Sequence, residues 1–424
     1  MNDVIYYHRD TCRLCKSHNV DLAINLKAIP VNNPNLGDGN KLSQDLLVKT
    51  EVPLDIYRCT DCGMIQLLDM INPKVQYMDF RYQTSISLGL PQHFKDYANK
   101  VLEKYATNKA PFVIEIGSND GTLLSSFQDH GCKVLGIDPS QPVSDIAISR
   151  GVPTIIDFFS RTLGMRVQRE YGKADIVICN NTFANLDKLD DFLSGVKCIL
   201  SDNGVLLIET AHGLSVIKNL QIDTVYHEHL SYFLITSLDK WFISHNMEII
   251  DVDTIKTKGG SLRIAIQLNG GFRTRQESVD KIIQFESNSG ILSKEPFYNF
   301  SKRLNNAQTE ITSLMKKTIS KGEKIAGYGA SVGSLTLLYQ LGLTPYVDFF
   351  IDDKPLTESI LLPTRDIPVY DKYFLMDEMP SVVIIFAFRY AEDIMSKNRD
   401  YLNAGGCFVV PIPQLKIIHG DQID

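Results

Sequence analysis

The sequence has no long apolar run, and basic residues are fewer than acidic ones. No run reaches the roughly eighteen apolar residues of a membrane-spanning helix. The first residues, MNDVIYYHRD, lack the basic and then apolar pattern of a secretory signal. The 43 Lys and Arg against 50 Asp and Glu give a net charge of −7, whereas a nucleic-acid or membrane-surface binder needs a basic face. We therefore expect a cytoplasmic protein with no nucleic-acid and no membrane partner.

The composition is that of an ordinary globular protein of more than one domain. At 424 residues the chain is too long for one core. The 44% hydrophobic content provides enough apolar surface to fold without disulfides. In a reducing compartment, the eight cysteines are then expected to be thiols or metal ligands.

Four of the cysteines form two matched pairs near the N-terminus. Cys12 and Cys15 stand in CRLC, and Cys59 and Cys62 stand in CTDC. Two Cys-x-x-Cys turns can offer four thiolates to one tetrahedral Zn²⁺, and four protein ligands leave no open position for catalysis. The spacing predicts one structural Zn²⁺ in a module of residues 1–75.

The rest of the chain alternates short apolar runs with helical segments twice. From residue 109 the runs FVIEI, KVLGID, TIID, DIVIC and GVLLIE predict a parallel sheet with crossover helices, followed by a hairpin of MEIIDVDTI and SLRIAIQL at its edge. Residues 275–321 are helical in pattern. A second alternation, from KIAGYGAS to CFVVPIP, predicts a smaller doubly wound unit. We predict an α/β chain with domains at 1–75, 76–272 and 273–424.

The glycine turn after the first strand of the central unit favours S-adenosylmethionine. The stretch EIGSNDGTLL puts Glu115, Gly117, Asn119, Asp120 and Gly121 at a strand-turn-helix junction. A nicotinamide fingerprint would require glycines where Asn and Thr stand at the second and third positions. The E-x-G-x-x-x-G form is instead typical of class I methyltransferases, whose ligand carries an ammonium and a sulfonium group and no pyrophosphate.

Three later strands of the same unit also end in residues suited to this ligand. Asp138 follows KVLGI, where a carboxylate can accept both ribose hydroxyls. Asp157 and Phe158 offer an acceptor for the adenine amino group beside an aromatic surface. Asn180 and Asn181 could line the other side of the cofactor.

The segment VYHEHLSYF, residues 225–233, concentrates groups that move protons. It follows the fifth strand, where ligands of a parallel α/β domain sit. If it is extended, Tyr226 and Glu228 face one way while His227 and His229 face the other. A turn would bring Glu228, His229 and Tyr232 together. Several titratable groups on a cofactor-side loop favour catalysis over a structural role.

The order of these motifs resembles the sugar C-methyltransferases that act on nucleotide-linked 4-keto-deoxyhexoses. The resemblance rests on the Cys-x-x-Cys pairs, EIGSNDGTLL, DFFS, YHEHLSYF, GGSLR and GYGAS, and it spans nearly the whole chain. It implies methylation at C3 of a sugar nucleotide, with dTDP expected, an N-terminal zinc module, a central cofactor domain and a C-terminal domain that helps to hold the substrate. A monomer is the expected state.

The resemblance also implies roles for individual residues. A C3 proton beside the C4 ketone is acidic only because the enolate is delocalised, so the enzyme needs a base and a group that stabilises the enolate oxygen. His229 is the first choice for the base, with Tyr226 and Glu228 orienting it or stabilising the enolate. Tyr82 of FRYQTSIS is the alternative base, and the choice between His229 and Tyr82 stays open.

The chain departs from the family at two positions. Asn185 stands where similar sequences usually have histidine, and an amide can hydrogen-bond a keto oxygen but cannot exchange a proton at neutral pH. Gly333 stands where the family often has Lys or Arg. The turn GYGASVGS could still bind a phosphate through backbone N–H groups. The candidate substrate-binding residues are Gly329, Ser331, Ser334, Lys354, Arg365 and Arg389.

Two other functions fit parts of the sequence. A nucleotide-sugar epimerase or isomerase would use the C-terminal unit, but GYGASVG lacks the full dinucleotide fingerprint, although Asp352 and Asp353 come close to the required acidic position. A non-enzymatic adaptor would use the zinc module for nucleic acid or protein. The basic residues around the knuckles are too few and too scattered for a phosphate-tracking face; they are Arg9, Arg13, Lys16 and Arg58.

Overall fold

A seven-stranded sheet with helices on both faces forms the centre of the computed structural model, which describes residues 5–31, 50–86, 89–255, 259–353, 361–362 and 367–420. Its strand order is β10-β9-β8-β11-β12-β15-β14. The strands are β8 (Phe112–Ile116), β9 (Lys133–Asp138), β10 (Thr154–Ile156), β11 (Ala174–Asn180), β12 (Leu200–Ala211), β14 (Met247–Ile255) and β15 (Ser261–Leu268). The first five are parallel, and β14 and β15 form the predicted antiparallel hairpin.

Both faces of this sheet are buried, which explains why its strands are continuous apolar runs rather than alternating ones. Val113 of β8 packs on one side with α3, α4 and α5, while Ile114 packs on the other with α6, α7, α9 and α10. The helices are α3 (Leu90–Tyr105), α4 (Thr122–Gln128), α5 (Gln141–Ser149), α6 (Arg161–Tyr171), α7 (Leu189–Ile199), α8 (Gly213–Lys218), α9 (Ile235–Ser244) and α10 (Glu277–Asn288). The sheet is therefore doubly wound, as predicted.

The N-terminal part consists of short antiparallel strands around the cysteine turns. The strands are β1 (Tyr6–His8), β2 (Val20–Ile24), β3 (Ile29–Pro30), β4 (Glu51–Val52), β5 (Ile56–Cys59), β6 (Ile65–Leu67) and β7 (Asp69–Ile71), followed by α2 (Pro73–Tyr77) and the 3₁₀ turn η2 (Thr84–Ile86). One further strand, β13 (Ser231–Tyr232), joins this part from the middle of the chain: it pairs with β6 in the four-stranded sheet β13-β6-β5-β2. The end of the VYHEHLSYF segment thus belongs to the N-terminal sheet.

The C-terminal part is built on a second seven-stranded sheet, which also has parallel strands at its centre. Its order is β18-β19-β17-β16-β20-β21-β22, with parallel central strands and an antiparallel strand at each edge. Its elements are β16 (Ile325–Tyr328), α12 (Val332–Gln340), β17 (Phe349–Asp352), β18 (Leu361–Leu362), β19 (Ile367–Asp371), α13 (Phe374–Glu378), β20 (Val382–Ile385), η6 (Phe388–Tyr390), α14 (Ala391–Lys397), α15 (Arg399–Asn403), β21 (Cys407–Val410) and β22 (Lys416–His419).

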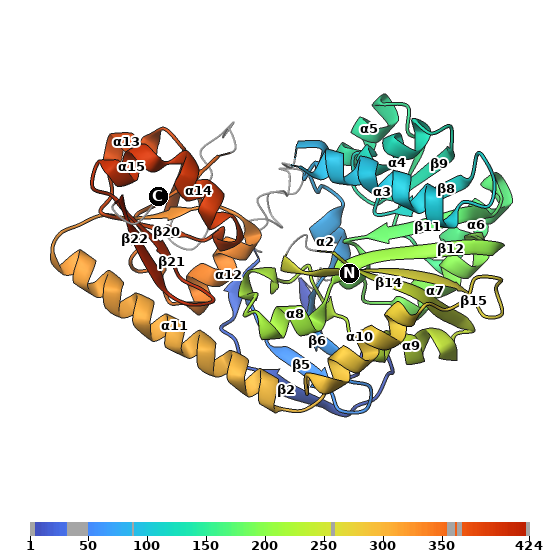
Figure 1. Ribbon diagram of the computed structural model, residues 1–424, viewed down its shortest axis with the longest axis horizontal. Coiled ribbons are helices and arrows are strands. Elements are labelled where there is room, and N and C mark those ends of the chain that lie inside the picture. The colour runs from blue at the N-terminus through green and yellow to red at the C-terminus, as the bar shows by residue number, and fades with distance from the viewer. Residues whose placement is uncertain are drawn as a thin grey trace.

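A single long helix, α11 (Glu295–Ser320), connects the two sheets. It runs along the lower edge of the molecule and passes the N-terminal strands on its way to the C-terminal part (Figure 1). Its buried side chains, including Phe300, Ile311 and Met315, share one apolar cluster with both of those parts. The three parts are therefore packed together rather than joined by bare linkers. No helix in the described ranges is long and apolar enough to cross a bilayer.

Candidate active site

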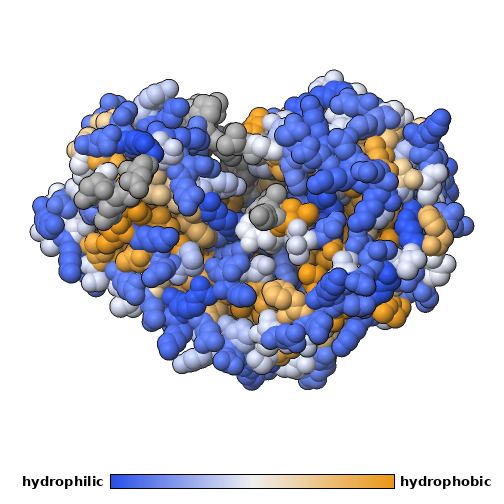
Figure 2. Space-filling view, viewed as in Figure 1, coloured by the Kyte–Doolittle hydropathy of each residue, from blue (hydrophilic) through white to orange (hydrophobic). Residues whose placement is uncertain are grey.

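One cavity of about 910 Å³ lies between the two large sheets, next to the point in each sheet where the strand order reverses. In an open parallel sheet, ligands bind where neighbouring strands lead off in opposite directions. In the central sheet this point lies between β8 and β11, and in the C-terminal sheet between β16 and β20. Gly117 and Asn181 line the cavity from the first, and Gly329 and Phe386 line it from the second. The hollow between the two halves is visible in Figure 2.

Most of the residues selected from the sequence line this cavity. They are Tyr82, Gly117, Asn119, Asp138, Asp157, Phe158, Asn180, Asn181, Asn185, Tyr226, Glu228, His229, Gly329, Ser331 and Arg389. Glu115, Asp120, Gly121 and Ser334 are not among the lining residues. Lys354 and Arg365 lie outside the described residues.

The glycine turn takes the conformation that its sequence requires. Gly117 has φ +79°, and a Cβ there would lie 2.1 Å from Thr182 Oγ1, so a glycine is needed where β8 and β11 lead into the cavity. Asp138, at the end of β9, accepts the backbone N–H of Asn119 (2.9 Å) and of Ser140 (2.9 Å). Burial raises the pKa of the Asp138 carboxyl. Both oxygens keep a second lone pair for ribose hydroxyls.

Other groups here fit S-adenosylmethionine. The Asn180 side-chain Nδ2 is buried and has no hydrogen-bond partner among the described residues, so it can donate a hydrogen bond to a bound ligand. Asp157, Phe158 and Phe159 also line the cavity, and the N–H of Asp157 donates to the carbonyl of Asp138 (3.2 Å), so an acceptor and an apolar surface follow directly after β10. When bound, the cofactor supplies a methyl group made electrophilic by its sulfonium.

Two residues of the glycine turn hold a neighbouring segment: Asn119, which also lines the cavity, and Asp120, which does not. Asn119 Oδ1 accepts the N–H (3.0 Å) and Oγ1 (3.1 Å) of Thr84, and its Nδ2 donates to the carbonyl of Tyr82 (2.8 Å). The buried Asp120 accepts the N–H of Ser85 (3.0 Å). The turn therefore fixes the backbone from Tyr82 to Ser85 over the cofactor side of the cavity.

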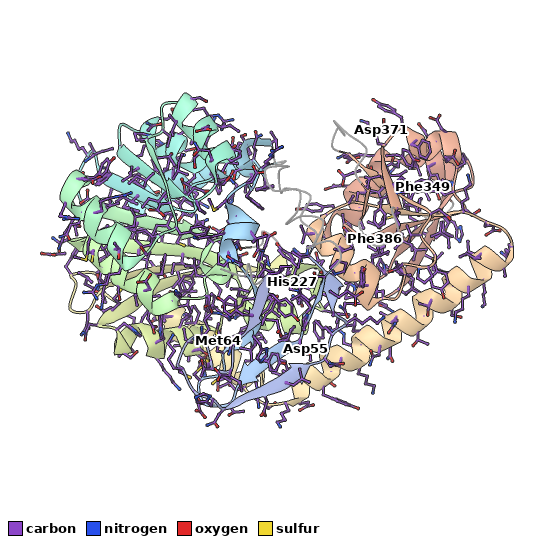
Figure 3. The ribbon with its side chains drawn as sticks, turned by 180° about the vertical axis from the view of Figure 1, so that it is seen from behind. Asp55, Met64, His227, Phe349, Asp371 and Phe386 are labelled. Atoms are coloured by element: carbon purple, nitrogen blue, oxygen red, sulfur yellow. The ribbon has the colours of Figure 1, made fainter. Side chains whose placement is uncertain are left out.

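Residues 226–229 form a turn, not an extended strand, because the N–H of His229 donates to the carbonyl of Tyr226 (2.9 Å). Tyr226, Glu228 and His229 all line the cavity. His227 points the other way, 5% exposed, with Nε2 against the carbonyl of Val52 (3.2 Å). Figure 3 shows it at the centre of the molecule, on the side of the N-terminal strands. Tyr232 does not join the site: it is 1% exposed and lies in the core.

Tyr226 and His229 form a hydrogen-bonded pair. The carbonyl of Thr224 lies 2.8 Å from His229 Nδ1, and a carbonyl can only accept, so Nδ1 carries a proton. In the neutral ring, Nε2 is then an acceptor, and the Tyr226 hydroxyl donates to it (2.9 Å). Burial, with a contribution from Glu228, raises the pKa of Tyr226 well above its usual value, so the phenol keeps its proton.

Several lining residues were not found from the sequence. Tyr77, at the end of α2, is hydrogen-bonded to Asn185, and burial together with Glu228 raises its pKa well above the usual value. In the sequence, only the helix-starting pair Asn72-Pro73 and the aromatic residues Tyr77, Phe80 and Tyr82 that come after it could have pointed to this segment. Asp187 and Asp223 also line the cavity, and nothing in their local pattern distinguished them from solvated carboxylates.

The C-terminal lining is anchored to the turn. Arg389 Nη2 contacts Asp223 Oδ1 (2.6 Å), and Thr336 Oγ1 of α12 donates to the carbonyl of Val225 (2.8 Å). Ser331 and Ser334 form a capping box at the start of α12, which explains why Ser334 is buried away from the cavity. Asp352 accepts the N–H of Ala330 (2.8 Å).

The cysteine thiols fit one Zn²⁺. The four Sγ atoms lie within 4.8 Å of one another, and the Cys12–Cys62 and Cys15–Cys59 pairs are 3.6 Å apart. Four thiolates at Zn–S distances of about 2.3 Å in a tetrahedron would be roughly 3.8 Å apart. With all four positions filled by protein, the metal would be structural, as predicted from the spacing.

Family models match three consecutive stretches of the chain. They are described as "Putative zinc binding domain" for residues 12–77, "Methyltransferase domain" for residues 91–252 and "C-methyltransferase C-terminal domain" for residues 256–413. The last two cover the cofactor side and the opposite side of the cavity.

Similar proteins include "C-methyltransferase NovU" of Streptomyces niveus, 29% identical over 414 residues, which are 97% of this chain and 98% of NovU. Among solved structures, magnesium protoporphyrin IX methyltransferase (ChlM) of Synechocystis PCC 6803 with bound SAM is 14% identical, with 43% of this chain and 81% of that chain covered and a TM-score of 0.33. The CcbJ methyltransferase of Streptomyces caelestis is 12% identical, with 42% and 90% covered and a TM-score of 0.33.

The family models and the full-length relative agree on methyl transfer as the reaction class. The cavity is lined by residues suited to bind S-adenosylmethionine. The chain is an S-adenosylmethionine-dependent C-methyltransferase with an N-terminal zinc-binding domain.

Proposed function

We propose that the chain methylates C3 of a nucleotide-linked 4-keto-6-deoxyhexose, with dTDP as the nucleotide. One observation carries the proposal: the hydrogen-bonded pair Tyr226–His229 lines the same cavity as the cofactor residues Gly117 and Asp138. Carbon methylation at a position next to a ketone needs a proton acceptor within reach of the methyl donor. The resemblance of the motif order to the sugar C-methyltransferases supports the sugar as substrate.

The proton at C3 leaves through Tyr226 in this proposal. In neutral His229 the ring nitrogen that can accept a proton is Nε2, and it already accepts the Tyr226 hydroxyl. As the C3–H bond breaks, its proton passes to the Tyr226 oxygen while the Tyr226 proton passes to Nε2, and the electron pair becomes the C3–C4 double bond of an enolate. The carbonyl of Thr224 stabilises the imidazolium that forms. Direct abstraction by His229, or by Tyr82, would require the substrate to displace this hydrogen bond or to sit on the Tyr82 side.

Two side chains near this pair are suited to the enolate oxygen. Asn185 reaches the cavity from the 3₁₀ turn η3 (Phe183–Asn185), and Tyr77 lies against it. A neutral amide and a phenol whose pKa is raised by burial both donate without being ionised at neutral pH. Asn185 therefore keeps a binding role for the keto oxygen even though it cannot replace the proton exchange of a histidine.

The nucleotide would occupy the C-terminal end of the cavity. Gly329, Ser331 and Arg389 line it there, together with Val332 and Gly333, the first two residues of α12, where a phosphate could accept backbone N–H groups. Arg389 already faces a carboxylate, Asp223, at 2.6 Å, so a phosphate would have to share or replace that contact. The domain boundaries 1–75, 76–272 and 273–424 belong to this proposal, with the last domain as the nucleotide-sugar binding unit.

The test is incubation of the purified chain with methyl-labelled S-adenosylmethionine and a small panel of nucleotide 4-keto-6-deoxyhexoses, followed by mass spectrometry of the sugar. We expect a gain of one methyl group at C3 of at least one dTDP-linked member. The C3 proton should also exchange with deuterated solvent when no methyl group is transferred. Failure of both reactions across the panel would contradict the proposed substrate class.

A further inference from the structure

Arg13 is a buried arginine inside the first zinc knuckle, between Cys12 and Cys15. Its side chain is 0% exposed. Nη1 donates to the carbonyl of Leu230 (2.9 Å), and Nη2 donates to the carbonyl of Leu67 (3.0 Å). Leu230 directly follows His229, and its carbonyl also accepts the N–H of Leu67 (2.9 Å). The guanidinium therefore clamps the C-terminal end of the turn that carries Glu228 and His229.

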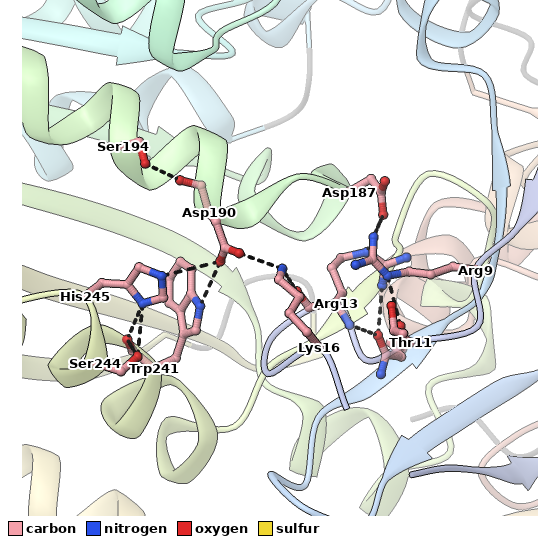
Figure 4. A network of polar contacts seen from close by, with 11 residues as sticks. Arg9, Thr11, Arg13, Lys16, Asp187, Asp190, Ser194, Trp241, Ser244 and His245 are labelled. Carbon is pink, nitrogen blue, oxygen red and sulfur yellow. Dashed lines mark hydrogen bonds and ion pairs between the residues drawn. The ribbon is translucent and has the colours of Figure 1, made fainter. Parts of the chain in front are cut away.

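The same guanidinium reaches a second segment of the cavity wall. Arg13 Nε contacts Asp187 Oδ1 (3.2 Å), and Asp187 also accepts from Arg9 Nη1 (2.8 Å) and the Tyr7 hydroxyl (3.2 Å). Figure 4 shows Arg9 and Arg13 together below Asp187. Asp187 stands two residues after Asn185 and is 12% exposed. Three donors from the N-terminal part thus fix the segment that holds the Asn185 amide.

We propose that Arg13 and Asp187 are positioning residues for the methylation, so that the zinc knuckle sets the spacing between Asn185 and the Tyr226–His229 pair. The molecule that would lie between Asn185 and the Tyr226–His229 pair is the proposed sugar substrate, and in that respect this inference rests on the proposed function. The clamp itself rests only on the contacts of Arg13 and Asp187.

The geometry requires an arginine. One planar guanidinium satisfies two carbonyls and a carboxylate from three separate segments, which a lysine ammonium cannot do with the same fork of donors. Burial lowers the pKa of Arg13, but only to about 10, so the side chain is charged at neutral pH. Zn²⁺ bound by Cys12 and Cys15 would hold the backbone of Arg13, so the clamp on the turn would depend on the metal.

The test compares three variants in the zinc-loaded full-length chain. Arg13→Lys keeps the charge but loses the fork, and Asp187→Asn is a milder change that leaves Arg13 in place. Lys16→Gln is the matched control, because Lys16 ties the same knuckle to Asp190 (2.9 Å) but contacts neither cavity segment through its side-chain charge. Zinc content is measured for each variant, so that loss of metal is separated from loss of the clamp.

We expect kcat for methyl transfer and the rate of C3 proton exchange to fall about 100-fold in Arg13→Lys, because a displacement of about 1 Å has that effect on a positioned reaction. Asp187→Asn should show a smaller loss in kcat. The dissociation constant of S-adenosylmethionine and the zinc content should be those of the wild type in all three. Unchanged kcat in both Arg13→Lys and Asp187→Asn, or an equal loss in Lys16→Gln, would overturn the positioning role.

Amide hydrogen exchange decides the same question without a substrate. Residues 183–188 and 224–232 should exchange faster in Arg13→Lys than in Lys16→Gln, with the zinc-binding turns equally protected. Equal exchange in these two segments would overturn the clamp even if the sugar is correct. Conversely, a wild-type chain that methylates no member of the panel, but shows the faster exchange in Arg13→Lys, would contradict the substrate and leave the clamp supported.

Discussion

At the scale of single residues, the Tyr226–His229 pair makes the proton path testable. A relay predicts that Tyr226→Phe stops C3 proton exchange as completely as His229→Ala, with a loss of about 10²–10⁴-fold for removal of a general base. If Tyr226 only orients the ring, Tyr226→Phe should keep most of the exchange. Tyr232→Phe is the matched control, because its hydroxyl also faces the carbonyl of Thr224 (3.4 Å) but lies in the core.

The exchange rate is measured by mass spectrometry in deuterated solvent, together with the affinity for S-adenosylmethionine. A Tyr82→Phe variant measured alongside decides the remaining choice of base. Loss of exchange in Tyr82→Phe, with full exchange in Tyr226→Phe and His229→Ala, would move the base to Tyr82 and refute the relay.

His227 should make the protein less stable in acid. Burial lowers its pKa from 6.5 to about 4, so the folded state holds the neutral ring. The resulting stability is complete above pH 6.5, because neither state binds a proton there. As pH falls towards 4, the unfolded state takes up a proton that the folded state does not, and about 3 kcal/mol is lost.

The matching variant is His227→Gln, whose amide can still donate to the carbonyl of Val52 but does not titrate. The thermal unfolding midpoint is measured between pH 7 and 4 for both proteins. We expect the midpoint of the wild type to fall more steeply with acid than that of the variant. Parallel curves would show that His227 does not contribute the proposed dependence.

At the scale of elements, β13 explains why a zinc module belongs to this enzyme. The strand adds the end of the VYHEHLSYF segment to the sheet built on the cysteine turns, and the turn with Glu228 and His229 ends two residues before it. An edge strand of two residues has little stability of its own and depends on its partner, β6. The position of Glu228 and His229 in the active site therefore depends on the N-terminal sheet being folded.

Zinc removal should separate the two halves of the reaction. In the chain treated with a chelator, or in Cys59→Ser, we expect loss of C3 proton exchange before loss of affinity for S-adenosylmethionine, whose residues lie on the central sheet. Cys179→Ser, a buried cysteine outside the metal site, is the control. Metal analysis should find one zinc per wild-type chain. A metal-free chain that still exchanges the C3 proton at the wild-type rate would contradict this dependence.

The elements that the sequence predicts well are those whose pattern is local. Both doubly wound sheets, the hairpin at the edge of the first and the cysteine turns follow from apolar runs and spacing. The pairing of β13 with β6 could not be predicted, because it joins residues more than 160 positions apart and Ser231–Tyr232 has no strand signal of its own. Likewise, Arg13 and Asp187 are ordinary charged residues until the fold brings them to 3.2 Å.

The candidate site shows the same division. Asp138 and Asn180 were found because strand ends of a parallel sheet converge on one edge. Glu115 and Asp120 were selected by the same rule but do not line the cavity, because one is enclosed in the strand and the other turns towards Ser85. Tyr77 was missed because its position depends on how α2 packs against the central sheet, which no local periodicity encodes.

At the scale of the whole molecule, the turn at residues 226–229 is where all three parts meet. The N-terminal part holds Leu230, the C-terminal part holds Val225 through Thr336, and the central sheet delivers the segment itself. The substrate cavity is thus bounded by parts whose mutual placement depends on α11 and on contacts such as that between Arg389 and Asp223 (2.6 Å). A change at the seam should affect substrate binding more than cofactor binding.

Gly333 is the position at which to test this seam. A Cβ at this residue would lie 2.2 Å from the backbone oxygen of Asp223, so the start of α12 packs directly against the 3₁₀ turn η4 (Ile222–Thr224). The contact gives a physical reason for glycine at a position where the resemblance to the sugar C-methyltransferases led us to expect Lys or Arg. Because the clash is with backbone, Gly333→Ala must push α12 away from η4 rather than move a side chain.

We expect Gly333→Ala to raise KM for the nucleotide sugar about tenfold, a change of ~1.4 kcal/mol, while the dissociation constant of S-adenosylmethionine stays that of the wild type. Gly290→Ala is the control: Gly290 does not line the cavity, and its φ of +71° makes alanine unfavourable although no neighbour would lie closer than 3.9 Å to the added Cβ. It should lower the unfolding midpoint and leave KM unchanged. An unchanged KM in Gly333→Ala would mean that the nucleotide is bound without help from the start of α12, whereas equal rises in KM in both variants would point to general loss of stability instead of the seam.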